Sequence, residues 1–323
     1  MKANQFQALL IILSCIAAYL IPFELFLFSY VVLGSLHYLT ELAWLHEKKY
    51  FTSSAKPELI TIFICAIIVS VSYVCYRLGF DVRSVLPFWN AQYSTHFIFL
   101  AFALSFSAIF IKKRKDKIIL LIIVVIGVYL LRNQFYYLLL IGLLLPTLIH
   151  VFVFTGIFML VGIKKNPSFW AKACFIIFIV CSISFWLIPV SLPTLSEKIK
   201  SNYFLSGFDM LNKVFIALFD GTVFNEENKE LIFESSFSIK IQRFVAFAYT
   251  YHYLNWFSKV RIIAWHKVNK LRLIFAILLW LIALGVYFYD FKTGILTLYF
   301  LSMLHVLMEF PLNMQSFQIL IKK

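Results

Sequence analysis

The sequence predicts an all-α integral membrane protein, a polytopic bundle of about ten transmembrane helices with both termini in the cytoplasm. Of its 323 residues, 62% are hydrophobic and only 14% are charged. The mean hydropathy of +0.89 lies far above that of soluble domains. Apolar runs near the roughly 20 residues that cross a bilayer recur along the chain. We therefore expect a single transmembrane domain over residues 1–323.

Polar breaks between the apolar runs define the expected spans. The first two runs are separated only by Ile21-Pro22, which predicts a tight helical hairpin. Lys2 and the apolar stretch after it resemble a signal peptide, but no clean cleavage site follows, so we expect this helix to be retained. The spans cover approximately 6–21, 23–45, 58–76, 94–111, 117–131, 134–163, 168–189, 240–258, 272–289 and 294–312.

Basic residues gather in every second loop, as expected of cytoplasmic loops, and most acidic residues lie in the opposite loops. The net charge of +14 therefore reflects topology, and we expect no nucleic acid partner. We expect the protein in the inner (cytoplasmic) membrane, with membrane lipids and a hydrophobic small molecule as partners. The basic clusters include Lys48 and Lys49, Lys112 to Lys117, Lys164 and Lys165, Lys259 to Arg272, and Lys322 and Lys323.

One extracytoplasmic loop is long, residues 190–239. Within it, apolar residues recur at helical spacing, which predicts an amphipathic helix on the outer leaflet. That helix either covers a lateral entrance for a lipid substrate or is a connector with an apolar face. The residues of this pattern are Phe204, Phe208, Leu211, Phe215 and Leu218.

Two spans contain the same local motif, LHxLxE. It reads Leu36-His37-Tyr38-Leu39-Thr40-Glu41 in the second span and Leu304-His305-Val306-Leu307-Met308-Glu309 in the tenth. At four-residue spacing the imidazole and the carboxylate project from one helix face, so they can bind a common metal or each other. Ionisable groups in a bilayer are costly, which favours a function for both motifs.

Two further histidines lie at comparable depth. His252 belongs to a Tyr251-His252-Tyr253-Leu254 segment that repeats the HYL of the second span, and His150 follows Pro146, which we expect to bend its helix. All four spans run from outside to inside, so one layer in the cytoplasmic half can hold every group. We expect a single pocket with six metal ligands, with hydrogen bonds to the imidazoles from Tyr38, Tyr253 and Asn255. The expected ligands are His37, Glu41, His150, His252, His305 and Glu309.

This ligand set predicts a metal-dependent enzyme. Imidazoles and carboxylates without thiolates leave iron or zinc as the choices, and six ligands are enough for two ions. Iron would support an oxygenase or desaturase-like reaction on a lipid or other hydrophobic substrate, and zinc would support lipid hydrolysis. A proton-coupled transporter that uses these residues as a relay, and a scaffold in which they only secure packing, stay open. No P-loop, GxGxxG, GxSxG or HExxH motif occurs.

With its length and its histidines on several spans, the chain resembles the Brp/Blh family of bacterial membrane β-carotene cleavage oxygenases. More broadly, it resembles histidine-ligated non-haem iron membrane enzymes. The resemblance implies iron and an oxygenase reaction. The local motifs differ, because no HG pair occurs, and the segments 247–259 and 304–313 look like those of a distinct family of bacterial membrane proteins.

Overall fold

The computed structural model describes residues 3–47, 56–80, 93–258 and 270–322, and these parts of the chain are helical without a strand. The chain divides into two compact units. Unit 1 comprises Met1–His37 and Lys165–Ile295, and unit 2 comprises Tyr38–Lys164 and Leu296–Lys323. The predicted all-α class is confirmed.

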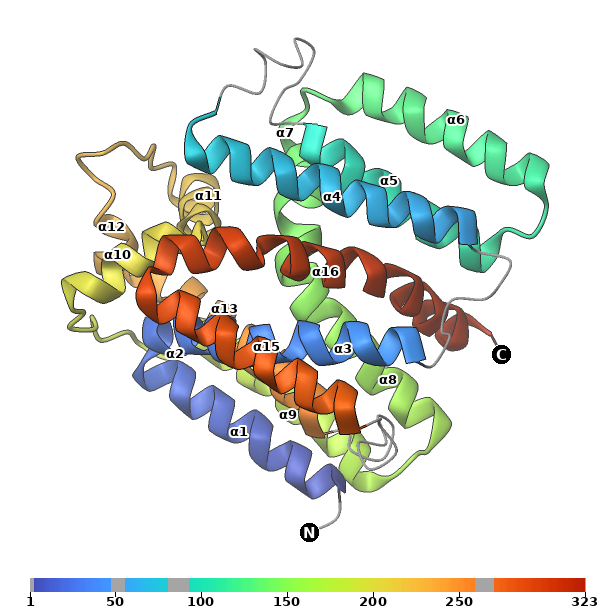
Figure 1. The fold of residues 1–323 in the computed structure, drawn as a ribbon. Coiled ribbons are helices and arrows are strands. Elements are labelled where there is room, and N and C mark those ends of the chain that lie inside the picture. Colours follow the sequence, from blue (N-terminus) through green and yellow to red (C-terminus); the bar gives the residue numbers. More distant parts are fainter. Residues whose placement is uncertain (1–2, 48–55, 81–92, 259–269, 323) are drawn as a thin grey trace. The chain divides into compact units, whose positions relative to one another are not determined.

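Unit 1 is organised around one buried helix, α13, against which α1, α2, α9, α11, α12 and the π-helix η1 pack (Figure 1). The side chains of α13 are buried over most of its length, which explains why its polar residues need internal partners. The helices of the unit are α1 (Ala3–Leu20), α2 (Pro22–Phe28), η1 (Ser29–Gly34), α9 (Phe169–Leu187), α10 (Glu197–Ser206), α11 (Asp209–Asp220), α12 (Leu231–Glu234), α13 (Ser236–Ser258) and α15 (Lys270–Tyr289).

The predicted break at Ile21-Pro22 is confirmed. Helix α1 ends at Leu20, and α2 begins with Pro22 at its first position. Ile21 between them has φ −140° and ψ 59°, outside the helical region. Proline suits this position because its fixed φ favours a helix start and its missing N–H has no helical partner there.

Where the sequence pattern predicts one helix over Phe204 to Leu218, the structure has two, α10 and α11. Helix α10 ends at Ser206, the next residue, Gly207, has a φ of 79°, and α11 begins at Asp209. Glycine adopts this left-handed conformation without steric cost, so it ends the helix. Helix α11 is amphipathic as expected: Leu211 and Ile216 are buried, while Phe219 is exposed. Its position on the outer leaflet stays a prediction.

A buried hydrogen-bond network joins these helices to α13 within unit 1. The Tyr203 hydroxyl lies 2.7 Å from Asn212 Oδ1 and 2.6 Å from Gln242 Oε1. Asn212 Nδ2 donates to Ser238 Oγ at 2.8 Å, and Gln242 Nε2 donates to the Pro22 carbonyl at 3.3 Å. Helices α10 and α11 are therefore held against α13 by polar contacts as well as by apolar packing.

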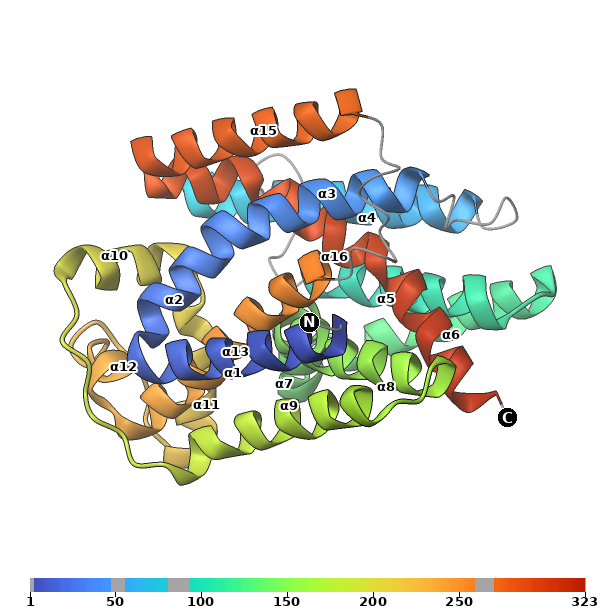
Figure 2. The same cartoon turned by 90° about the horizontal axis from the view of Figure 1, so that it is seen from below.

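Unit 2 contains α3 (Ser35–Glu47) from Tyr38 onward, α4 (Lys56–Leu78), α5 (Tyr93–Phe110), α6 (Arg114–Leu131), α7 (Phe135–Tyr137), the π-helix η4 (Leu138–Phe154), α8 (Thr155–Lys165) and most of α16 (Phe291–Ile321). Helix α5 packs against α4, α6 and η4 (Figures 1 and 2). An apolar core joins α4, α5, η4 and α16, and its largest members are Phe154 and Phe310.

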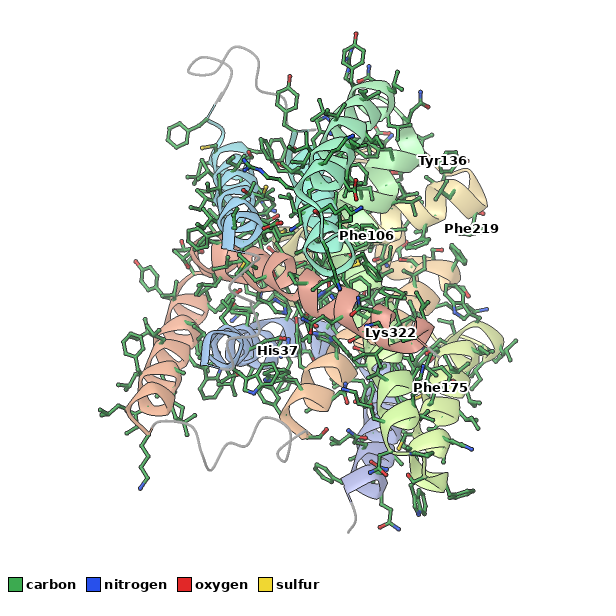
Figure 3. All side chains as sticks on the ribbon, turned by 90° about the vertical axis from the view of Figure 1, so that its right-hand side faces the viewer. His37, Phe106, Tyr136, Phe175, Phe219 and Lys322 are labelled. Carbon is green, nitrogen blue, oxygen red and sulfur yellow. The ribbon has the colours of Figure 1, made fainter. Side chains whose placement is uncertain are left out.

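A helix lies over each of the ten expected spans, and six described helices are long and apolar enough to cross a membrane. Apolar helices at 4–20 and 273–289 are shorter. Helix α16 continues past the expected end at 312 to Ile321. Large apolar side chains such as Phe106, Tyr136 and Phe219 are exposed at 40%, 69% and 74% (Figure 3). Several apolar helices thus indicate a multi-pass membrane protein, whereas ten spans and the orientation of the termini stay predictions.

Candidate metal centre

Four of the six expected ligands meet within unit 2. His150 comes from η4, His305 and Glu309 come from α16, and Glu41 comes from α3. The Nε2 atoms of His150 and His305 are 3.3 Å apart. Glu309 Oε2 lies 3.4 Å from His150 Nε2 and 3.8 Å from His305 Nε2, and Glu41 Oε2 lies 3.6 Å from His305 Nε2. We call these four residues the unit 2 cluster.

The unit 2 cluster is removed from solvent. The exposed fractions are 1% for His150, 4% for His305, 2% for Glu309 and 1% for Glu41. Burial of two carboxylates costs several kcal/mol per ion unless positive charge compensates them. A divalent cation or imidazole protons can supply that charge.

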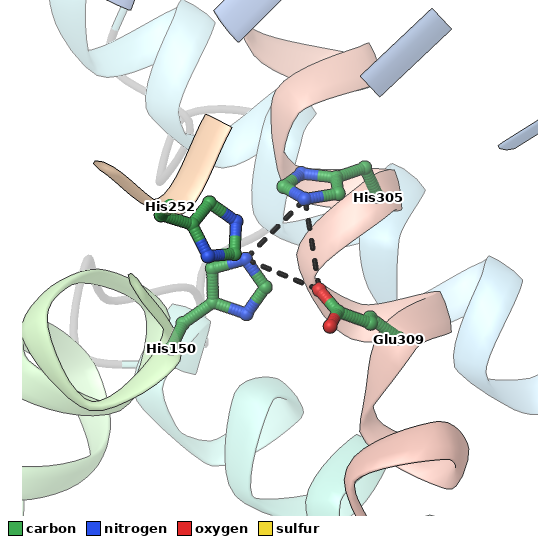
Figure 4. A group of neighbouring side chains, drawn as sticks. All are labelled: His150, His252, His305 and Glu309. Atoms are coloured by element: carbon green, nitrogen blue, oxygen red, sulfur yellow. Dashed lines mark hydrogen bonds and ion pairs between the residues drawn. The ribbon is translucent and has the colours of Figure 1, made fainter. Parts of the chain in front are cut away.

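The distances in the unit 2 cluster fit a bound metal. Two ligand atoms that share a metal at about 2.1 Å lie roughly 3.0 to 3.4 Å apart at ordinary bond angles, and no more than about 4.2 Å apart. The three distances between the ligand atoms of His150, His305 and Glu309 are 3.3, 3.4 and 3.8 Å, all within that limit (Figure 4). Buried His/Glu groups in this structure could therefore hold a metal ion, whose identity the geometry leaves open.

A hydrogen bond at Nδ1 of His305 orients its imidazole ring and thereby its Nε2 atom. His305 Nδ1 lies 3.2 Å from the carbonyl oxygen of Ser302, one turn earlier on α16. When Nδ1–H donates to that carbonyl, the lone pair of Nε2 faces Glu309 and His150, as a metal ligand requires. The sequence predicts such hydrogen bonds from Tyr38, Tyr253 and Asn255, whereas the partner observed for His305 is the backbone carbonyl of Ser302, which no side-chain pattern indicates.

The helix around Pro146 adopts a wider turn. Residues Leu138–Phe154 form a π-helix that contains both Pro146 and His150. Proline lacks an N–H and clashes with the carbonyl four residues earlier, so a wider register relieves the strain that we expected to bend the helix. Departures of this kind are frequent at functional sites. Here the π-helix presents the buried His150 imidazole to His305.

Tyr38 lies beside the unit 2 cluster. Its ring centroid is 6.1 Å from that of His305, and the side chain is 2% exposed. The phenol ring of Tyr38 thus lies next to His305. A hydrogen bond from Tyr38 to an imidazole stays a prediction.

The other two expected ligands, His37 and His252, meet within unit 1. His37 Nε2 and His252 Nε2 are 3.2 Å apart, and both residues are buried, at 1% and 5% exposure. Aromatic rings surround His37: its ring centroid is 5.1 Å from Tyr253, 5.5 Å from Trp256 and 6.4 Å from Phe257. We call His37 and His252 the unit 1 pair.

A second π-helix, η1, directly precedes the turn that carries His37. In a π-helix the backbone hydrogen bonds join residues five apart, and in η1 side chains also donate to a backbone carbonyl. Trp280 Nε1 donates to the Val32 carbonyl at 2.9 Å, and Ser35 Oγ donates to it at 3.2 Å. Each His–His contact thus involves a histidine that lies in a π-helix or just after one.

Tyr253 and Asn255 lie on α13 next to His252. The Tyr253 and His37 rings are in contact, as expected of a residue that supports the imidazole. Asn255 Oδ1 lies 3.5 Å from the side-chain nitrogen of Gln7 on α1. Support of a ligating imidazole by Asn255 stays a prediction.

The structure thus assembles the expected ligands as a group of four in unit 2 and a pair in unit 1. That all six surround one pocket stays a prediction; His37 and Glu41 are one turn apart on α3. Each of the two histidine pairs is in direct contact, which a shared metal and a hydrogen-bonded proton relay would both use.

Comparison of the chain with known proteins finds no similar protein. No model of a protein family matches the chain, and neither the curated proteins nor the solved structures contain a match.

Proposed function

We propose that the protein is an integral membrane metal-dependent enzyme, specifically a non-haem iron oxygenase or desaturase-like enzyme that acts on a lipid or other hydrophobic substrate. One observation carries the proposal: buried ligand atoms of His150, His305 and Glu309 converge within 4.8 Å on membrane-type helices. A packing role alone would not require two imidazoles and a carboxylate to turn their ligand atoms toward one point.

Iron is the preferred metal because of the donor set. Two histidines and one carboxylate, with coordination positions left open, are typical of non-haem Fe(II) oxygenases. Sulfur ligands, which favour copper(I) and zinc, are not among the four residues of the unit 2 cluster. When bound there, iron would supply the capacity to bind and activate dioxygen.

The protein's own residues would keep the site dry and hold protons. Buried Leu304, Leu307, Phe154 and Phe310 belong to the apolar core of unit 2, on the helices that carry His150, His305 and Glu309. Such surroundings exclude water and admit a hydrocarbon chain. Glu41 Oε2, 3.6 Å from His305 Nε2, can hold a proton or bind a second ion.

The test combines metal analysis with oxygen consumption. The full-length protein, purified in detergent and loaded anaerobically with Fe(II), should retain about one or two iron ions per chain. It should then consume dioxygen when supplied with membrane lipid extract and ascorbate as reductant. In a desaturation, the substrate loses two hydrogens and one O₂ becomes two H₂O, with two further electrons and two protons from the reductant side. Absence of bound metal in the wild-type protein would overturn the proposal.

Zinc-dependent lipid hydrolysis is the second candidate, and the extra carboxylate of Glu41 favours it. Zinc lowers the pKa of its bound water to about 7, and a nearby carboxylate can accept the proton. The zinc-loaded protein would then release fatty acid from phospholipid without oxygen. The iron enzyme would be inactive without oxygen. An anaerobic assay of fatty acid release from phospholipid therefore distinguishes the two candidates, because only the zinc enzyme would release product.

A further inference from the structure

Asn313 is a buried side chain on α16 whose polar atoms are not satisfied. Its exposed fraction is 0%, and among the residues that the structure describes neither Oδ1 nor Nδ2 has a hydrogen-bond partner. A buried amide without partners typically costs about 1 to 3 kcal/mol. Such a group calls for a ligand or an ordered water.

Other buried amides show that this chain normally satisfies such groups. In unit 1, Asn212 accepts from Tyr203 and donates to Ser238, and Gln242 accepts from Tyr203 and donates to Pro22. In unit 2, the buried Ser316 lies less than one turn beyond Asn313, and its hydroxyl donates to the Leu312 carbonyl at 3.0 Å. Asn313 therefore differs from Ser316 on the same helix and from the amides of unit 1.

The position of Asn313 relates it to the unit 2 cluster. His305, Glu309 and Asn313 follow one another at four-residue intervals on α16, so they lie along one side of the helix. Asn313 is about 6 Å along the axis from Glu309. A molecule that touches both positions would place a polar group at Asn313 and an apolar chain at the cluster.

We propose that Asn313 binds the polar end of an amphipathic substrate whose chain reacts at the unit 2 cluster. This inference deepens the proposed function and rests on it. An amide offers one acceptor oxygen and two donor hydrogens. The best complement is an uncharged group that both donates and accepts, which means a long-chain alcohol or carboxamide. The reacting carbon would lie only a few bonds from that polar end.

Binding of a long-chain alcohol tests the proposal directly. The full-length protein in detergent is titrated with 1-hexadecanol, with hexadecane as the apolar probe, and bound ligand is counted by native mass spectrometry. Asn313→Leu should weaken hexadecanol binding by roughly tenfold or more, because the hydrogen bonds are lost. Ser316→Ala, whose hydroxyl is used within the helix, is the matched control and should bind like the wild type. Hexadecane should bind all three proteins equally.

A second measurement needs no variant, in case Asn313→Leu fails to fold. On the wild-type protein, 1-methoxyhexadecane retains an acceptor but lacks the donor, and should bind roughly tenfold more weakly than hexadecanol. Equal affinity for the alcohol and the ether would overturn the proposal. The proposal would also be overturned if Asn313→Leu bound hexadecanol as the wild type does and had a higher unfolding temperature. Asn313 would then bind an ordered water and not the substrate.

Metal content separates this inference from the proposed function. Iron is measured in the same samples and should be unchanged in Asn313→Leu. If the wild type holds iron and the variant binds hexadecanol normally, the inference fails alone. If no protein holds metal but Asn313→Leu still loses hexadecanol, the proposed enzyme fails and the polar binding site remains.

Discussion

The two His–His contacts have the same geometry in different surroundings. In both the unit 1 pair and the unit 2 cluster, the imidazole centroids are 4.9 Å apart with an interplanar angle of 79°. Within its own unit, the His305 side of the unit 2 contact is flanked by the carboxylates of Glu41 and Glu309, whereas His37 of the unit 1 pair contacts aromatic rings.

The difference between these surroundings decides what each contact can do. Carboxylates add negative charge and further ligand atoms, so the unit 2 cluster can hold a cation by itself. Aromatic rings fix the orientation of an imidazole but donate no ligand to a first-row metal.

The largest expected effect is loss of metal from unit 2. His305→Ala or Glu309→Gln should lower metal affinity by more than the roughly 10–100-fold that loss of an outer hydrogen-bond partner costs. Inductively coupled plasma mass spectrometry of the purified variants measures the metal retained. Ser316→Ala is the control on the same helix. Full metal content in both His305→Ala and Glu309→Gln would contradict ligation by this cluster.

A smaller loss is expected from unit 1. If the six predicted ligands hold two ions, His252→Ala should reduce the metal content to about one ion per chain, while the variants of unit 2 lose more. The same mass spectrometry counts the ions, with Tyr251→Phe as a control next to His252. Unchanged metal in His252→Ala would show that the unit 1 pair serves packing alone.

A stability effect without a metal effect is expected where α10 and α11 are held against α13. Tyr203→Phe removes the hydroxyl whose single hydrogen is shared between Asn212 Oδ1 and Gln242 Oε1, and should lower the free energy of unfolding by about 1 to 3 kcal/mol. Burial raises the pKa of the Tyr203 phenol well above its usual range, so the group stays a donor at all ordinary pH values. Chemical unfolding in detergent gives the change. Loss of metal in Tyr203→Phe would show that the network is coupled to the site.

The smallest effect is expected at Asp290, which precedes α16. Hydrogen bonds from the Thr293 side chain and backbone hold the pKa of the Asp290 carboxyl below its usual value. The folded pKa is thus below the unfolded value of about 3.9, so its stabilisation is present above that pH and is lost as the pH falls below it. Unfolding temperatures of wild type and Asp290→Asn should differ slightly at pH 7, and the difference should shrink as the pH falls through the folded pKa of Asp290. A difference that stays constant throughout the acid titration would contradict this origin.

Much of the fold follows from local patterns. Apolar runs and polar breaks located a helix at each expected span, and Pro22 marked a helix start. These features depend on the cost of unsatisfied backbone groups in an apolar solvent, which acts on each segment separately. The extension of α16 to Ile321 was missed because its last turns carry polar residues such as Gln315, Ser316 and Gln318.

Part of the site also follows from the sequence. Four-residue spacing in LHxLxE placed His305 and Glu309 on one side of α16, and the cost of buried charge singled them out. The hydrogen bond from His305 to Ser302 was not foreseen, because any residue type at position 302 supplies the same carbonyl. The π-helix around His150 was not foreseen either, since Pro146 signals a disturbance without fixing its form.

The sequence by itself thus determined the helices, their apolar character and the ionisable residues whose burial in an apolar span costs enough free energy to indicate a function. Only the tertiary structure decided which of these residues meet: His150 with His305 and Glu309 in unit 2, and His37 with His252 in unit 1. It also left Asn313 without a partner among the described residues. The physical reason is that helix formation and amphipathic spacing are local properties of the chain, whereas contacts between residues more than 150 positions apart depend on how whole helices pack.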